Sequence, residues 1–282
     1  MAVIEAGDFS YTYPSSTKPA IDGISFTIDK GEFVILTGPS GCGKTTLCRC
    51  LNGLIPHFYH GELKGRIRVA GLDVENNQIH DLAKHVGLVF QNPENQLFAL
   101  SVEKDVAFGL ENLGVPRDKM MQKVEWALKK AGIYELRERA PHELSGGQQQ
   151  RVAIAGILAM EPDIMVLDEP TSFLDPLGAK KIFEVIEELN QSFGVTVILV
   201  EHRLDLAARF ANHAIIMDKG KIVLDGKPRS ILDSEEARML GVGIPKATRL
   251  YQSLKEEDVF HSDVIPVTAE EMAKELRKVL KT

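Results

Sequence analysis

Cysteine is scarce in this sequence of 282 residues. Its three cysteines, Cys42, Cys48 and Cys50, lie close together in one short stretch, and no spacing typical of metal ligands accompanies them. Cysteines so few and so close exclude the disulfide framework that many small secreted proteins use for stability. We therefore expect free thiols and a reducing cytosol as the compartment of the protein.

Long apolar runs are lacking, and basic residues do not outnumber acidic ones. No run of about 18 consecutive apolar residues occurs, and the first residues lack a basic region followed by an apolar core. We therefore expect neither a membrane span nor a secretory route. The 40 acidic and 33 basic residues give a net charge of -7, which repels nucleic-acid phosphates, so we expect no nucleic acid among the partners.

The composition is that of an ordinary globular protein, and strand patterns open the chain. Hydrophobic residues make up 44% and charged residues 26%, which excludes bulk disorder in a chain long enough to bury a sizeable core. Apolar residues alternate over residues 2–28, which predicts a small antiparallel β layer. A continuous apolar run at residues 33–37 predicts a buried strand that leads through a glycine-rich loop to a helix at 44–54.

Beyond this first helix, the sequence predicts further strands, a helical insertion and one helix between two strands. The strands are expected at residues 65–70, 86–90, 164–167, 195–200, 214–217 and 222–224. Helical periodicity marks the insertion at roughly residues 95–160, and a helix at 178–189 joins two apolar strands that we expect to be parallel. The last two strands are expected to form a closing hairpin.

The glycine-rich segment after the strand at 33–37 matches the pattern G-x-x-x-x-G-K-[ST]. It consists of Gly38, Pro39, Ser40, Gly41, Cys42, Gly43, Lys44 and Thr45, with Thr46 next. Glycines allow backbone N–H groups to surround phosphate oxygens at the positive end of a helix. The motif therefore predicts nucleotide binding, with Lys44 on the β- and γ-phosphates and Thr45 on Mg²⁺. We expect this loop to lower the pKa of Cys42 and make the thiol reactive, unless burial raises that pKa.

Two carboxylates follow the apolar run at residues 164–167, where the predicted strand ends. In a protein with a phosphate-binding loop, such a strand end brings its carboxylates close to the nucleotide phosphates. We assign Asp168 to the metal ion, and we assign Glu169 to an attacking water as the candidate general base. Taken alone, the motif also fits an aspartate that merely caps a buried strand.

A second glycine-rich segment precedes the helical stretch at residues 149–160. It comprises Leu144, Ser145, Gly146, Gly147 and Gln148. Glycines at a helix N-terminus predict a second site for an anion. A chain that binds one nucleotide has no evident use for this second site on its own.

The phosphate-binding loop, the LSGGQ and LDEP segments at 144–148 and 167–170, and a later histidine occur in this order in ATP-binding cassette (ABC) transporters. The chain resembles their nucleotide-binding subunits over about residues 3–235. The resemblance implies an α/β fold, with a P-loop core, an antiparallel β subdomain and a helical signature subdomain at about 95–160. It also implies ATP, Mg²⁺ and ATP hydrolysis coupled to transport. In that family two subunits, identical or homologous, face head to tail, and the LSGGQ of one closes over the γ-phosphate bound by the other.

The resemblance also implies roles for residues outside the two glycine-rich segments. It assigns Tyr13 to adenine stacking, with the adjacent Tyr11 as the alternative, and Gln91 to sensing Mg²⁺ and the attacking water. It assigns His202, which follows an apolar strand, to the γ-phosphate. Residues 172–175 would cross the dimer interface. The other seven histidines, which include His57, His60 and His142, are expected on the surface.

The stretch that follows Gln91 resembles the ATPases of energy-coupling factor importers, which take up vitamins or transition-metal ions. The similar residues are 91–98 and 101–109. The resemblance implies a membrane coupling protein and a substrate-binding membrane protein as partners, and a peripheral position on the cytoplasmic face of the cell membrane. In that family, this stretch lies in a groove that receives helices of the coupling protein. In the alternative, the stretch is a generic helical insertion and Phe98 is ordinary core.

Other classes of ABC protein remain as alternatives. A soluble ATPase of DNA repair, cluster assembly or translation usually carries long coiled coils or two cassettes in one chain, and this sequence has neither. The ATPase of a conventional ABC importer is a second alternative, although no recognisable regulatory domain follows the closing hairpin. A catalytically inactive subunit is disfavoured because the expected site residues are all present, namely Lys44, Ser145, Asp168, Glu169 and His202.

The composition becomes more charged after the closing hairpin, and we expect residues 236–282 to form a helical C-terminal extension. Thr268 and Glu271 resemble a capping box at the start of a helix. The apolar face of that helix would consist of Met272, Leu276, Val279 and Leu280. Such a face packs on its own domain or contacts a second copy of the ATPase. Phe173 also bears on that contact, because the family more often has a small residue at its position.

Overall fold

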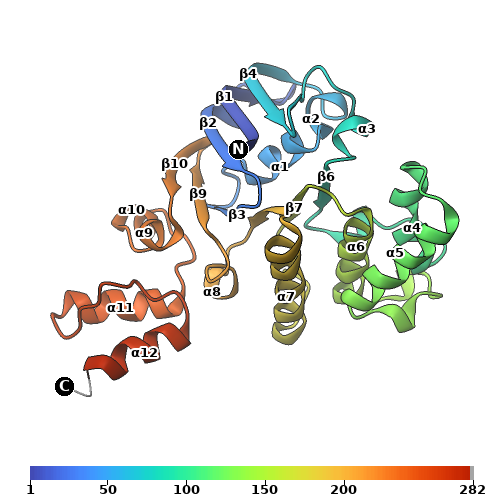
Figure 1. Ribbon diagram of the computed structural model, residues 1–282. Helices are drawn as coiled ribbons and strands as arrows, with labels where there is room; N and C mark the ends of the chain where they lie inside the picture. The colour runs from blue at the N-terminus through green and yellow to red at the C-terminus, as the bar shows by residue number, and fades with distance from the viewer. Residues whose placement is uncertain (280–282) are drawn as a thin grey trace.

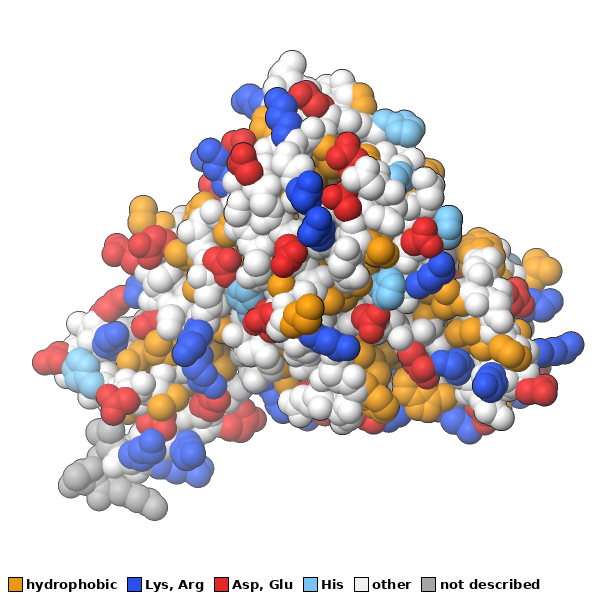
Figure 2. Space-filling model, turned by 45° about the horizontal axis from the view of Figure 1, so that its top comes forward, with side chains coloured by type: hydrophobic (Ala, Val, Ile, Leu, Met, Phe, Trp, Pro, Cys, Tyr) orange, Lys and Arg blue, Asp and Glu red, His pale blue; other side chains and the backbone are white. Residues whose placement is uncertain are grey.

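The computed structural model describes residues 1–279. Its strands lie in the middle, with the helices α4 (Val102–Asn112), α5 (Arg117–Lys130) and α6 (Gly146–Met160) on one side and the last helices of the chain on the opposite side (Figure 1). On the face that Figure 2 shows, acidic and basic side chains are interspersed. None of the helices within residues 1–279 is long and apolar enough to cross a membrane.

The first sheet is antiparallel, as the alternation near the N-terminus predicts. Its strand order is β2–β1–β4–β5. The strands are β1 (Ala2–Thr12), β2 (Ile21–Asp29), β4 (Glu62–Val69) and β5 (Leu72–Asp73). In β2, Ile24, Phe26 and Ile28 are buried and the residues between them are exposed, so one face of the sheet packs on the core and the other faces solvent.

The second sheet has the strand order β10–β9–β3–β8–β7–β6. The strands are β3 (Phe33–Thr37), β6 (Val86–Val89), β7 (Ile164–Asp168), β8 (Thr196–Val200), β9 (His213–Asp218) and β10 (Lys221–Gly226). From β9 to β6 the neighbours are parallel, whereas β10 pairs antiparallel with β9 as the expected hairpin. The carboxyl ends of the parallel strands therefore meet at one edge, which is where open α/β sheets bind ligands.

Apolar side chains cover both faces of this second sheet, which explains why β3, β7 and β8 read as continuous apolar runs. Phe33 and Ile35 belong to a core shared with α4, α5, α6 and the long helix α7 (Pro176–Phe193). Val34 and Leu36 belong to a second core, shared with the antiparallel sheet and with α1 (Lys44–Leu51). The sheet thereby fixes both α1 and α7 relative to its carboxyl edge.

The helix expected over residues 44–54 is divided, because α1 ends at Leu51 and the short helix α2 (Leu54–His57) follows. Gly53, between them, has a φ of 80°, and a Cβ atom there would lie 2.5 Å from the side chain of Leu82. Only glycine tolerates this close turn, so it ends the helix. The remaining short helices are α3 (Ile79–Leu82), α8 (Leu204–Ala207) and the 3-10 turns η1 (Pro93–Asn95), η2 (Tyr134–Leu136) and η3 (Pro141–Glu143).

Up to residue 279, four helices follow the closing hairpin, of which the first two pack on the main core and the last two share an apolar cluster of their own. They are α9 (Pro228–Leu232), α10 (Glu235–Met239), α11 (Lys246–Glu256) and α12 (Ala269–Val279). Tyr251, Phe260 and Met272 are buried together there. Arg229 pairs with Glu271, with Nη2 2.7 Å from Oε1, and the Thr268 hydroxyl accepts the N–H of Glu271 as the capping motif predicts. Of the expected apolar face, Met272 and Leu276 pack on this cluster, and Leu280 lies outside the described residues.

Candidate functional site

The phosphate-binding motif lies where β3 ends and α1 begins, and its glycines are required by close packing. Gly38 has a φ of 143°, and a Cβ atom on it would lie 2.0 Å from the carbonyl oxygen of Met217. Gly43 has a φ of 110°, and its Cβ would lie 2.5 Å from the carbonyl oxygen of Ala20. No other residue type fits these two positions without moving backbone atoms. The loop between them is therefore held in one shape.

The start of α1 offers several positive groups to a phosphate. Gly43 caps the helix without a side chain, so the first backbone N–H groups of α1 have no side-chain acceptor from that position. The buried ammonium of Lys44 donates to the carbonyl oxygens of Gly38 and Pro39 at 2.9 and 3.0 Å. It forms an ion pair with no carboxylate among residues 1–279. This arrangement is suited to an anion.

Asp168 ends β7 and points toward the same loop. Its side chain is only 3% exposed, and burial raises the pKa of its carboxyl above the usual range, while a hydrogen bond with Thr45 and the charge of Lys44 limit the rise. The contact with Thr45 places a hydroxyl and a carboxylate oxygen side by side at the mouth of the loop. Oxygen ligands of this kind suit Mg²⁺.

Glu169 follows Asp168, and the other predicted polar side chains lie around its carboxylate. Its Oε2 accepts from Nε2 of Gln91 at 2.9 Å and from the hydroxyl of Ser172 at 3.2 Å. Nε2 of His202 lies 3.1 Å from its Oε1. The three segments meet because β6, β7 and β8 are neighbours in the parallel sheet, and Gln91, Glu169 and His202 each lie just beyond the end of one of these strands. The predicted grouping is therefore present.

A cavity of about 440 Å³ lies between these groups and the phosphate-binding loop. Its lining includes the predicted residues Tyr13, Ser40, Gly41, Gly43, Lys44, Thr45, Thr46, Gln91, Glu169 and His202. The hydroxyl of Tyr13 lies 3.3 Å from that of Thr46 at one end of the cavity. Tyr11, the alternative stacking residue, is fully buried in the core instead, and burial raises its pKa to about 12. The Tyr13 ring is therefore placed where it could stack on an adenine base in the cavity, and the Tyr11 ring is not.

The second glycine-rich segment lies in a different cavity. Ser145 caps α6, and its hydroxyl accepts the N–H of Gln148 at 3.4 Å while Oε1 of Gln148 accepts the N–H of Ser145 at 3.0 Å. These residues line a cavity of about 600 Å³. Phe173 also lines this cavity, whereas no residue of the phosphate-binding loop does. A Cβ atom on Gly146 would lie 3.4 Å from the ring of Phe173, so this aromatic residue lies directly against the LSGGQ segment.

The expectation for Cys42 is corrected by its surroundings. The thiol is buried, and burial raises its pKa even though the ammonium of Lys44 lies 3.8 Å from Sγ. Loss of solvation outweighs the nearby charge, which is the alternative that the sequence left open. Cys42 is therefore a packing residue of the loop rather than a reactive thiol.

Two polar residues that matter in the structure were missed or misplaced by the sequence analysis. Glu201 follows β8 and is 4% exposed, and it accepts the hydroxyl of Thr171 and the N–H of His202 at 3.2 Å. The sequence signal that could have identified Glu201 is its position directly after a predicted strand, which resembles the position of Glu169 after the strand at 164–167. His213 was expected on the surface, but it is largely buried between Glu32 and Asp225. Glu32 lies 181 residues from it along the chain and Asp225 lies 12 residues away, and no local sequence pattern predicts these two contacts.

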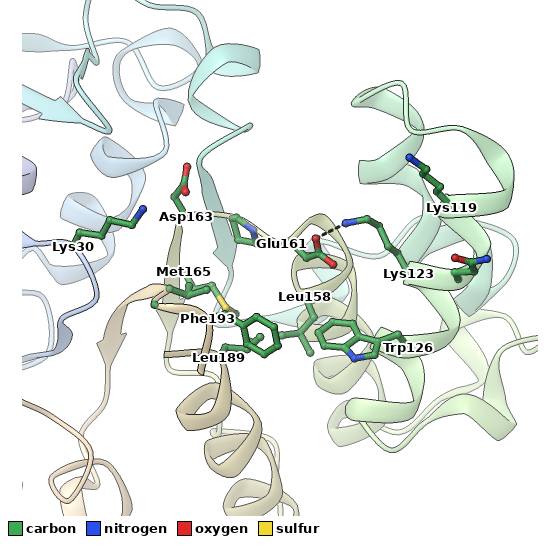
Figure 3. A pocket seen from close by; sticks show the side chains of 14 residues that line it. Lys30, Lys119, Lys123, Trp126, Leu158, Glu161, Asp163, Met165, Leu189 and Phe193 are labelled. Atoms are coloured by element: carbon green, nitrogen blue, oxygen red, sulfur yellow. Dashed lines mark hydrogen bonds and ion pairs between the residues drawn. The ribbon is translucent and has the colours of Figure 1, made fainter. Parts of the chain in front are cut away.

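A larger cavity, of about 650 Å³, lies at the opposite, amino-terminal edge of the second sheet. Figure 3 shows Trp126, Leu158 and Phe193 side by side along it, with Lys123 bonded to Glu161. Its lining holds none of the predicted phosphate-binding or catalytic residues. Chemistry, and not size, therefore identifies the cavity beside Lys44 as the candidate site.

Comparison with known proteins agrees with this site. A family model described as ABC transporter matches residues 21–172. The Clostridium novyi protein named energy-coupling factor transporter ATP-binding protein EcfA1 is 41% identical over 271 residues, which cover 94% of this chain and 95% of that protein. A relative from Methanosarcina mazei, provisionally named an ABC transporter ATP-binding protein, is 46% identical, and the matched region covers 86% of this chain but 41% of the relative. The chain thus spans about two fifths of the length of that longer relative.

Solved structures agree as well. CbiO1 from Clostridium perfringens, described as part of the ABC transporter complex cbiONQ, has a TM-score of 0.73 and 34% identity over 90% of this chain and 99% of that one. The ATP-binding cassette MJ0796, described as a dimer in a post-hydrolysis state bound to ADP and Pi, has a TM-score of 0.71 and 28% identity over 80% of this chain and 98% of that one. The expected fold is confirmed, and the chain belongs to the ABC transporter family.

Proposed function

We propose that the chain is the ATP-hydrolysing subunit of an energy-coupling factor importer that takes up a vitamin or a transition-metal ion. The observation that carries this proposal is an apolar surface that begins a few residues after Gln91. Phe98 is 65% exposed, Leu100 is 82% exposed and Phe108 is partly exposed, and the rings of Phe98 and Phe108 touch edge to face with centroids 4.6 Å apart. The names of the EcfA1 and cbiO1 relatives support the same assignment.

ATP and Mg²⁺ fit the residues around the candidate cavity. Lys44 and the amides of α1 would hold the phosphates, and Tyr13 would stack on the adenine. Thr45, Asp168 and Gln91 would hold Mg²⁺, which neutralises phosphate charge when it is bound. Among residues 1–279, no three His, Cys, Asp or Glu side chains group to hold a metal ion by themselves. This fits Mg²⁺, which takes few protein ligands and relies on phosphate oxygens and water.

Hydrolysis would proceed by in-line attack of water on the γ-phosphate. Glu169 would accept the proton of that water, because Gln91 and Ser172 hold its carboxylate beside the cavity. His202 would move from this contact to the γ-phosphate when nucleotide binds. Lys44 would stabilise the negative charge that develops in the transition state.

A second ATPase subunit, identical or homologous, would complete each site. The LSGGQ segment and the phosphate-binding loop of one chain line separate cavities, so a single chain cannot enclose a γ-phosphate between them. In a head-to-tail pair, Ser145, Gly146, Gly147 and Gln148 of one copy would close over the nucleotide of the other. The self-capped pair of Ser145 and Gln148 would then open, which frees their N–H groups for phosphate.

The membrane partners would dock on the side of the chain that carries Gln91. A cavity of about 440 Å³ lies next to Gln91 and is lined by Phe58, Tyr59 and Phe90. The aromatic residues of this cavity and the exposed side chains of Phe98 and Leu100 would provide apolar contacts for helices of a membrane coupling protein that also carries a substrate-binding membrane protein. Attachment there would hold the chain at the cytoplasmic face of the membrane. Gln91 would link these contacts to the hydrolytic site.

The substitution Phe98→Asp tests this docking surface. Burial of a phenylalanine side chain contributes roughly 1.5–3 kcal/mol, so we expect a charge there to abolish co-purification with the membrane coupling protein from detergent-solubilised membranes. Basal ATP hydrolysis by the isolated chain should stay unchanged, because Phe98 is not core. The matched control is Phe193→Asp, since Phe193 is equally exposed, at 65%, but lies at the opposite edge of the sheet. Assembly of the Phe98→Asp variant at the wild-type level would refute the docking proposal.

A further inference from the structure

The linker between α10 and α11 lies directly against the backbone of His202. A Cβ atom on Gly243 would lie 1.8 Å from the carbonyl oxygen of His202 and 3.0 Å from its carbonyl carbon. Such distances are far below van der Waals contact. Any side chain at this position must therefore displace either the linker or the loop of residues 201–203, which carries His202 and is called the histidine loop below. The absence of a side chain at Gly243 is therefore what lets the C-terminal helices approach His202.

The linker is anchored on both sides of Gly243. The N–H of Ile244 donates to the carbonyl oxygen of Val242 at 2.8 Å, which makes a tight turn with Gly243 at its tip. Val242 is buried and belongs to the main core, which also contains residues of α7 and α8. The N–H of Lys246, at the start of α11, donates to Oδ1 of Asp205 at 2.9 Å. Asp205 lies in α8, three residues after His202, so the C-terminal helices are bonded to the helix that directly follows the histidine loop.

The histidine loop is fixed from the opposite side by the core. The carboxylate of Glu201 accepts the N–H of His202 at 3.2 Å and the hydroxyl of Thr171. Thr171 belongs to the turn that carries Glu169, whose carboxylate lies 3.1 Å from the His202 imidazole. The backbone of His202 therefore lies between a carboxylate of the core and the glycine of the linker. The linker glycine thus contacts the segment that holds the imidazole beside Glu169.

We infer that Gly243 and Asp205 are positioning residues for His202, so that the C-terminal helices, and not the cassette core alone, set the place of this histidine. The inference rests on the proposed role of His202 in ATP hydrolysis and extends it to residues outside the ATP cavity. Relieving a 1.8 Å contact at position 243 requires a shift of more than about 1 Å between the linker and the His202 backbone; where that shift reaches the imidazole, a misplacement of about 1 Å lowers the rate of a positioned reaction by up to about a hundredfold.

The test is a double-mutant cycle on the full chain. We expect Gly243→Ala to lower kcat for ATP by about tenfold or more while KM changes by less than about twofold, because nucleotide binding uses Lys44 and α1. In a His202→Ala background, Gly243→Ala should cause no further loss of the residual rate. Asp205→Ala removes the hydrogen bond to the N–H of Lys246 at the start of α11 and leaves the apolar packing intact. We expect it to lower kcat about threefold in the wild-type background only.

A second readout needs no nucleotide. Gly243→Ala should shift the imidazole NMR signals of His202, assigned by their loss in His202→Ala, and leave those of His57 unchanged, because the His57 ring is bonded to the carbonyl oxygen of Val74. Gly7→Ala is the matched control, since Gly7 has no atom within 4 Å of an added Cβ, and it should change neither readout.

Three results would overturn the inference, and the first two of them spare the proposed function. If His202→Ala lowers kcat but Gly243→Ala and Asp205→Ala leave kcat and the His202 signals unchanged, the linker does not position the histidine. If Gly243→Ala or Asp205→Ala lowers kcat equally with and without His202, the effect of that variant is general destabilisation. Wild-type kcat in His202→Ala would instead refute the role of His202 in hydrolysis, whatever the linker does. If Gly243→Ala fails to fold, Asp205→Ala decides between these outcomes.

Discussion

His213 lies between two carboxylates that belong to different segments of the chain. Its Nδ1 is 3.0 Å from Oε2 of Glu32, and its Nε2 is 2.6 Å from Oδ1 of Asp225. Burial lowers the pKa of this imidazole, but hydrogen bonds to Asp225 and Glu32 raise it by more, so the pKa lies above its usual value. The charged imidazolium therefore ties the start of β9 to β10 and to the turn before β3.

We expect His213→Gln to lower the free energy of unfolding by about 1–2 kcal/mol at about pH 6. Because the pKa is raised in the folded state, this stabilisation is complete below the unfolded pKa of about 6.5 and disappears as the pH rises through the folded pKa. Urea unfolding of both proteins between about pH 6 and pH 9 measures the change. His142→Gln, at an exposed histidine, is the control. A difference that does not depend on pH would contradict a charged bridge.

Single residues also show how far sequence motifs predict a site. The spacing of the motifs predicts the grouping of Lys44, Asp168 and Glu169, because each lies next to the carboxyl end of a parallel strand and such ends converge. The environment of Cys42 is not predictable in this way, because the balance between burial and the Lys44 charge depends on packing. The linker glycine Gly243 carries no local signal either, since its constraint comes from a residue far away in the sequence.

At the scale of elements, the contact between β6 and α6 joins the second sheet to the helical region. A Cβ atom on Gly87 of β6 would lie 2.3 Å from Cγ2 of Ile157 on α6 and 3.2 Å from Pro162. At Gly87, β6 therefore lies closer to α6 than it could if residue 87 had a side chain. Periodicity predicts that both elements exist and which faces are apolar, but it does not predict how closely they pack.

We expect Gly87→Ala to lower the free energy of unfolding by about 1–3 kcal/mol, because the added methyl group forces β6 and α6 apart. Gly156→Ala is the matched control, since Gly156 lies on the same helix with no atom within 4 Å of an added Cβ. That change should instead raise stability by about 0.5–1 kcal/mol, through the better helix propensity of alanine. Thermal unfolding compares the two variants, and equal midpoints would show that Gly87 does not set this spacing.

The boundaries of elements were the least predictable part of the fold. The strands of the second sheet and β4 lie close to their predicted ranges, because their apolar patterns are regular, whereas no strand was predicted at β5. The helix expected at 44–54 is interrupted, because Gly53 meets Leu82 from a distant segment. Tertiary contacts of this kind override a helical pattern that is otherwise continuous.

At the scale of the whole molecule, the two glycine-rich loops line separate cavities of the chain, and the proposed function unites them in one site between two chains. The cavity beside Lys44 contains the candidate base Glu169 but no residue of the LSGGQ segment. That segment faces its own cavity, where Phe173 packs against Gly146. Hydrolysis in the proposed mechanism therefore requires two copies, and ATP should itself be part of the interface that joins them.

The substitution Glu169→Gln measures this requirement most directly. It removes the base but keeps the shape and the contacts of the side chain, so we expect ATP binding to persist and turnover to fall about a hundredfold or more. With ATP and Mg²⁺, light scattering on a sizing column should show a stable dimer, and without ATP a smaller species. Addition of Lys44→Ala should abolish the dimer, because the phosphates lose their cation. A Glu169→Gln variant that hydrolyses ATP at the wild-type rate, or that binds ATP and remains a monomer, would contradict a hydrolytic site shared between two chains.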